Sequence, residues 1–89
     1  MARPQVSEAM LDKIFQIVRA HLTVKIIEKG SGAFVSTHEI YGVIAEEFEK
    51  ELLDALHANN RKQFVRELLD VAASAIYGLA SFDAGAVEK

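Results

Sequence analysis

Apolar residues recur every three or four positions along three stretches of the chain, and this spacing predicts helices. The first stretch covers residues 7–28. It begins at Ser7, which suits a helix N-cap, and it ends before Gly30, a natural C-cap. Its segment 22–27 (LTVKII) is rich in β-branched residues, but the sequence offers no second strand to pair with it. A helix is therefore predicted throughout.

Two further helices are predicted, one on each side of Asn59. The tetrapeptide STHE (36–39) has the spacing of a capping box and opens a helix that continues to about Ala58. Asn60 is the expected N-cap of the third helix, with Gln63 at the capping-box position. Because the connection between these two helices is so short, they are expected to pack antiparallel.

These patterns predict a single all-α domain over residues 7–82, with flexible ends at 1–6 and 83–89. A chain of 89 residues can bury only a limited core, yet 51% of this one is apolar. Three helices with wide apolar stripes therefore predict part of an oligomeric helical bundle, with a homodimer or larger homo-oligomer completing the core.

Composition and charge exclude several classes of function. The chain has no cysteine, which excludes disulfides and thiolate metal sites. Its net charge is −3 and no basic block is present, so nucleic-acid binding is not expected. No apolar run approaches the roughly 20 residues of a membrane span, and the first ten residues do not resemble a signal peptide. A soluble cytoplasmic protein is expected.

Acidic residues are concentrated in AEEFEKELLD (45–54). A helix turns by about 100° per residue, which directs Glu46 and Glu49 largely away from the apolar stripe of the second helix. Glu47 and Glu51 are four residues apart and lie together at the edge of that stripe. The run therefore divides into a solvent-facing pair and a pair that borders the core.

The third helix offers Glu67 and Asp70, three residues apart on one flank. In an antiparallel pair these two acids could face Glu47 across a groove, and converging carboxylates suit Mg²⁺. The alternative interpretation is an ordinary solvated helix face, because glutamate is a good helix former and Glu46–Lys50 has the stabilising i,i+4 order. The residue pattern leaves both interpretations open.

Two segments carry a resemblance to a known family: HEIYGVIAEEFEKEL (38–52) and RKQFVRELLDVAASAIYGL (61–79). They resemble the MazG-like all-α nucleoside triphosphate pyrophosphohydrolases, closest to the short phage and bacterial forms. That family's signature is E-E-x-x-E on one helix and E-x-x-D on the next. The residues that match it are Glu46, Glu47, Glu67 and Asp70, and the sixteen residues from 51 to 66 fit the family's spacing. Lys50 departs from it, because the family has a glutamate there.

The resemblance implies a Mg²⁺-dependent enzyme in which a metal-activated water attacks a nucleoside triphosphate and pyrophosphate is released. In that interpretation Glu47, Glu67 and Asp70 hold the metal, and Glu46 or Glu51 supports them. Lys50 would remove a ligand and repel the cation. The alternative is therefore a non-catalytic helical module that keeps the fold and acts through oligomerisation or partner binding.

Other polar residues give weaker signals. His21 flanks the stripe of the first helix, His38 lies in a first helical turn and His57 lies near a helix end; none has a partner visible in the sequence. Tyr41 and Tyr77 could stack on a base, but their helical spacing favours packing. No Ser-His-Asp arrangement can be argued.

Overall fold

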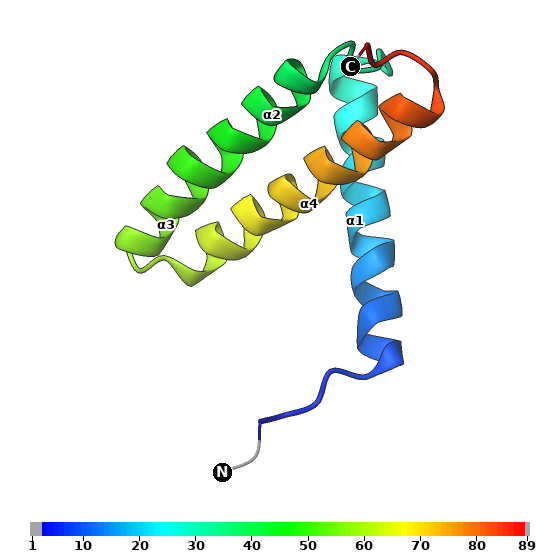
Figure 1. Cartoon of the computed structure of the whole chain (residues 1–89). Helices are drawn as coiled ribbons and strands as arrows, with labels where there is room; N and C mark the ends of the chain where they lie inside the picture. The colour runs from blue at the N-terminus through cyan, green and yellow to red at the C-terminus, as the bar shows by residue number, and fades with distance from the viewer. Residues whose placement is uncertain (1–2, 89) are drawn as a thin grey trace.

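A computed structural model describes residues 3–88 of the chain, and within that range it contains three helical rods and no strand (Figure 1). The all-α prediction with three main helices is confirmed. The second rod is continuous, but its middle third is a π-helix. The elements are α1 (Glu8–Lys29), α2 (Thr37–Ala45), the π-helix η1 (Glu46–Leu52), α3 (Leu53–His57) and α4 (Arg61–Asp83).

Side-chain caps determine where the three rods begin. The side-chain oxygens of Ser7, Ser36 and Asn60 each accept a hydrogen bond from the backbone N–H three residues further on, at 3.0–3.1 Å. These bonds satisfy N–H groups that the helix itself leaves without partners. Gly30 ends α1 at a φ of 88°, in the left-handed region that glycine tolerates. The predicted boundaries of the helices therefore agree closely with the structure.

The second rod and α4 form an antiparallel hairpin, as the sequence predicted (Figure 1). The turn between them places Asn59 at a φ of 55°, a left-handed conformation that asparagine adopts more readily than most residues. At the other end of the hairpin, Gly78 allows α4 to approach α2 closely. A Cβ atom on Gly78 would lie 3.0 Å from Cγ2 of Ile40.

The segment between α1 and α2 is held against the C-terminal part of α4. The Tyr77 hydroxyl donates a hydrogen bond to the Gly32 carbonyl at 2.7 Å. Ser81 is nearly fully buried, with 2% of its surface exposed. Its hydroxyl donates a hydrogen bond to the Tyr77 carbonyl at 2.9 Å and accepts one from the Phe34 N–H at 3.0 Å. Beyond α4 the chain turns back, and the N–H of Glu88 donates to the carbonyl of residue 35 at 3.0 Å.

Helix α1 crosses α4 steeply, and its N-terminal half extends away from the hairpin (Figure 1). The radius of gyration is 14.8 Å, larger than the roughly 12 Å expected for a compact domain of this length. Only Val18 of the α1 stripe is buried, and Phe15 is 63% exposed. The apolar residues that α1 leaves exposed in its N-terminal half include Met10, Leu11, Ile14, Phe15 and Ile17.

The core within the single chain is small: its buried apolar residues are Val18, Leu52, Ala55 and Ala73. On the helical wheel of the second helix, the apolar spacing predicts that Phe48 and Leu52 both point to the core. For Phe48 this prediction is wrong, because the residue is 57% exposed. The strip of this rod that α4 covers reaches Leu52 but does not extend to Phe48. Among the described residues, no helix combines the length and the apolarity needed to cross a membrane.

Candidate functional site

Three glutamates meet where η1 faces α4. One carboxylate oxygen from each of Glu47, Glu51 and Glu67 lies within 4.8 Å of the others. The antiparallel hairpin produces this arrangement, because it places the middle of the second rod opposite the first half of α4. The sequence therefore correctly placed Glu47 and Glu51 on the side of the rod that faces Glu67.

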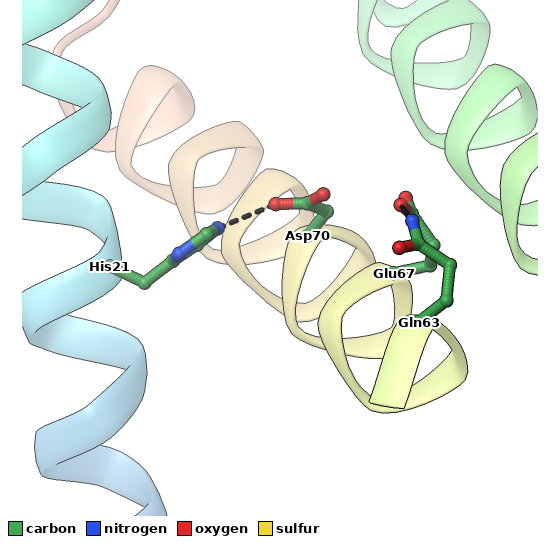
Figure 2. Close-up of polar contacts among 4 residues, drawn as sticks. All are labelled: His21, Gln63, Glu67 and Asp70. Atoms are coloured by element: carbon green, nitrogen blue, oxygen red, sulfur yellow. Dashed lines mark hydrogen bonds and ion pairs between the residues drawn. The ribbon is translucent and has the colours of Figure 1, made fainter. Parts of the chain in front are cut away.

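Glu67 is the most deeply buried member of this acidic cluster, with 7% of its surface exposed. Its Oε1 accepts a hydrogen bond from the side-chain amide of Gln63, one turn earlier in α4 (Figure 2). Its Oε2 is buried without a hydrogen-bond partner, and so is Oε2 of Glu47. A buried carboxylate oxygen without a partner is costly. A proton or a cation would therefore stabilise these two oxygens.

The pKa values of the cluster reflect this burial and crowding. The pKa of Glu47 is raised to about 7, first by burial, then by the neighbouring Glu51 carboxylate, and further by Asp70 and Glu67. Burial is also the largest cause that raises the pKa of Glu67, with Glu51 and Asp70 adding to it. The hydrogen bond from Gln63 opposes that rise. Without a cation the cluster is therefore more stable when it holds a proton near neutral pH.

Asp70 lies beside the cluster and makes a contact of its own. Nε2 of His21 in α1 lies 2.5 Å from Oδ1 of Asp70, and Figure 2 shows the two side chains pointing toward each other across the gap between α1 and α4. Both side chains are largely buried. The sequence pattern does not reveal this pair. One signal was available, since His21 follows Val18 by three residues and so lies on the buried side of α1.

The remaining predicted residue, Glu46, is exposed and lies outside the acidic cluster. Glu49 and Lys50 are exposed as well. Within the described part of the chain, Lys50 forms no salt bridge with the cluster. The structure thus brings together Glu47, Glu51 and Glu67 with Asp70 adjacent, and it leaves Glu46 in solvent.

A cavity of about 340 Å³ opens next to these acids, between α1, the connecting segment and the hairpin. Glu47 and Asp70 line one part of it, and Lys25 and Lys29 of α1 line another. Neither lysine forms a salt bridge within residues 3–88. The rings of Phe34 and Tyr77, both lining residues, pack edge to face with centroids 5.3 Å apart. Tyr77 therefore has the packing role that its helical spacing favoured.

The donor atoms of this site are all carboxylate oxygens, which are the ligands of hard divalent cations such as Mg²⁺. The fold and the site together define an all-α chain with a carboxylate cluster inside a helical hairpin. Comparison with protein-family models, with curated proteins and with solved structures finds no match for this chain.

Proposed function

We propose that the acidic cluster binds a divalent cation, with Mg²⁺ as the physiological ion, and that the chain is a nucleoside triphosphate pyrophosphohydrolase of the MazG-like kind. Glu47, Glu51 and Glu67 hold the ion, and Asp70 completes the set. When bound, Mg²⁺ supplies the positive charge that polarises a phosphoryl group for attack by water.

The observation that carries this proposal is the environment of Glu67. A carboxylate that is 7% exposed, has one oxygen without a hydrogen-bond partner and faces two further carboxylates is unfavourable in the metal-free chain. An ordinary solvated helix face would leave such side chains in water. A cation would satisfy the partnerless oxygens and remove the repulsion among the three acids.

The adjacent cavity supports a phosphorylated small molecule as the substrate. Its volume of about 340 Å³ lies within the usual range of ligand pockets. Lys25 and Lys29 can neutralise phosphate charge on one side of the cavity, while the carboxylate-bound cation neutralises it on the other. A polyphosphate would therefore be held between two sources of positive charge, which suits a nucleoside triphosphate.

Metal binding is tested by titrating Mg²⁺ and Mn²⁺ into the full chain and measuring heat and thermal stability. We expect the wild type to bind, Glu67→Gln to lose at least about tenfold in affinity, and Glu46→Gln to match the wild type. Glu46 is the matched control, because it is a glutamate in the same segment that lies outside the cluster. Absence of binding by the wild type at millimolar metal would remove the proposal.

Activity is tested separately, by measuring pyrophosphate release from a panel of ribonucleoside and deoxyribonucleoside triphosphates with Mg²⁺ or Mn²⁺. Activity in the wild type that Glu67→Gln abolishes and Glu46→Gln retains supports the enzyme. Metal binding without release of pyrophosphate from any triphosphate would instead favour the non-catalytic module.

The second candidate function, a helical oligomerisation module, is favoured by the exposed apolar stripe on α1. Leu11, Ile14 and Phe15 continue the face that buries Val18, and in the single chain they are exposed to solvent. We propose that a second copy of the chain covers this stripe. Light scattering after size exclusion should give a dimer or larger assembly for the wild type and a smaller species for Phe15→Glu. Tyr41→Glu, at an exposed position on α2, is the control.

A further inference from the structure

The π-helix η1 lies between two α-helices that share one axis. Ala45, before it, has φ and ψ of −62° and −42°, and Leu53, after it, has −66° and −40°. Both residues are therefore helical, and the rod continues through the π-helix without a break. A π-helix bonds i to i+5, so this segment contains an additional residue compared with an α-helix, and such segments are rare and often lie at functional sites.

The additional residue changes which side chain lies one turn beyond Glu47. In an α-helix, Lys50 would lie about 60° to one side of Glu47 and Glu51 about 40° to the other, because three residues turn by about 300° and four by about 400°. Each residue of a π-helix turns less, so Lys50 is directed further from Glu47 and Glu51 comes closer to alignment with it. The structure agrees with this shift: both residues are exposed, but the Glu51 side chain has an atom within 4.8 Å of the Glu47 and Glu67 carboxylates, whereas Lys50 forms no salt bridge with them within residues 3–88.

We propose that η1 is a one-residue insertion absorbed by the helix, and that it aligns the carboxylate of Glu51 with Glu47 at the ion site while it turns the ammonium group of Lys50 away. Without Lys50 the segment 46–52 reads E-E-F-E-E-L, which contains the pattern E-E-x-x-E. The inference rests on the proposed function, because cation binding is what makes a carboxylate preferable to an ammonium group there. The partnerless, nearly fully buried Oε2 of Glu67 identifies the point where that cation binds.

The proposal predicts how two deletions differ. Deleting Lys50 should convert η1 to α-helix and leave both flanking helices in register. Deleting Tyr41, an exposed residue of α2, should rotate the part of the rod before it by about 100° relative to the part after it. We expect the Lys50 deletion to bind Mn²⁺ within about threefold of the wild type, and the Tyr41 deletion to lose at least about tenfold. Thermal unfolding followed by circular dichroism should rank the two deletions in the same order.

Two substitutions test the same inference without altering chain length. Glu51→Gln should weaken Mn²⁺ binding at least about tenfold, and Lys50→Gln should leave it unchanged. If the wild type binds Mn²⁺ but the Lys50 deletion is as impaired as the Tyr41 deletion, the insertion is excluded and the metal site stands. If Lys50→Gln alters binding and Glu51→Gln does not, the assignment of Glu51 is overturned. If the wild type binds no metal, the proposed function fails. The insertion is then judged by thermal stability alone, and an equal loss of stability in the Lys50 and Tyr41 deletions would overturn it.

Discussion

His21 Nε2 lies 2.5 Å from Asp70 Oδ1, and this contact ties α1 to the same turn of α4 that borders the acidic cluster. One oxygen of Asp70 is thereby occupied by α1, which fixes the orientation of the carboxylate. Helix α1 thus contributes an imidazole at the edge of a site whose acids all come from the hairpin. Such a partner orients a carboxylate in the way that outer-shell groups orient metal ligands.

Substituting His21 should weaken both the docking of α1 and the binding of metal. His21→Ala removes a largely buried hydrogen bond, so we expect a loss of about 1–2 kcal/mol in the free energy of unfolding, measured by urea denaturation. Mn²⁺ affinity should also fall, because Asp70 is no longer held in one orientation. His57→Ala, at an exposed position, should change neither quantity. Unaltered Mn²⁺ affinity in His21→Ala would limit His21 to a structural role.

The metal-free chain should lose stability as pH rises from about 4.5 to about 7. Within this range the folded chain keeps a proton on Glu47, whose pKa is raised to about 7, while the unfolded chain has released it. The free energy of unfolding falls with pH wherever the folded state binds more protons. The raised pKa of Glu67 acts in the same direction. We expect a decrease on the order of 1–2 kcal/mol after solvent screening, measured as thermal unfolding across pH.

Saturating Mg²⁺ is the control for this pH profile. A cation replaces the proton of Glu47 at high pH, so the profile should flatten when the metal is present. Glu67→Gln should flatten the metal-free profile in part, since it removes the raised pKa of Glu67 itself and the smallest of the causes that raise the pKa of Glu47. A metal-free profile that rises with pH would contradict the environment described for Glu47.

Substituting Glu67 should reveal a conflict between stability and binding. In the metal-free chain at pH 8, Glu67→Gln relieves repulsion with Glu51 and Asp70, so we expect thermal stability to rise by a few degrees. The same substitution should abolish stabilisation by Mg²⁺. Glu49→Gln, at an exposed position outside the cluster, should show neither effect. A destabilised Glu67→Gln variant would show that the hydrogen bond to Gln63 outweighs the repulsion.

Two glycines should respond oppositely to a larger side chain. A Cβ at Gly42 in α2 would meet no atom within 4 Å, so Gly42→Ala should stabilise the chain by about 0.5–1 kcal/mol through helix propensity. Gly78→Val should destabilise it by about 1–3 kcal/mol, because its Cβ would already lie 3.0 Å from the Ile40 side chain. Denaturant unfolding of both variants checks this pair. Destabilisation by Gly42→Ala would indicate that another copy of the chain packs against α2.

The helix boundaries could be predicted because their determinants are local. Ser7, Ser36 and Asn60 cap the N–H groups three residues further along, so the signal and the structure lie within one turn. The proximity of Glu47 to Glu67 could also be predicted, because two helices joined by a short turn pack antiparallel.

The parts that could not be predicted depend on less local effects. The π-helix differs from an α-helix by one residue in the hydrogen-bond pattern, and the apolar spacing of this segment does not reveal it. The spacing E-E-x-x-E therefore put Lys50 at the third acidic position, whereas the structure brings Glu51 into the acidic cluster. The contact between His21 and Asp70 joins residues 49 apart in sequence and depends on the angle at which α1 crosses α4, which the connecting segment sets.

The confinement of the acidic cluster to the hairpin also has a consequence for folding kinetics. Glu47, Glu51, Glu67 and Asp70 all lie within one helix–turn–helix segment, and contacts of low sequence separation form early. The folding chain therefore meets the repulsion among these acids before α1 has docked. A divalent cation that bound the nascent hairpin would lower this barrier, so Mg²⁺ should accelerate refolding of the wild type and leave the refolding rate of Glu67→Gln unchanged.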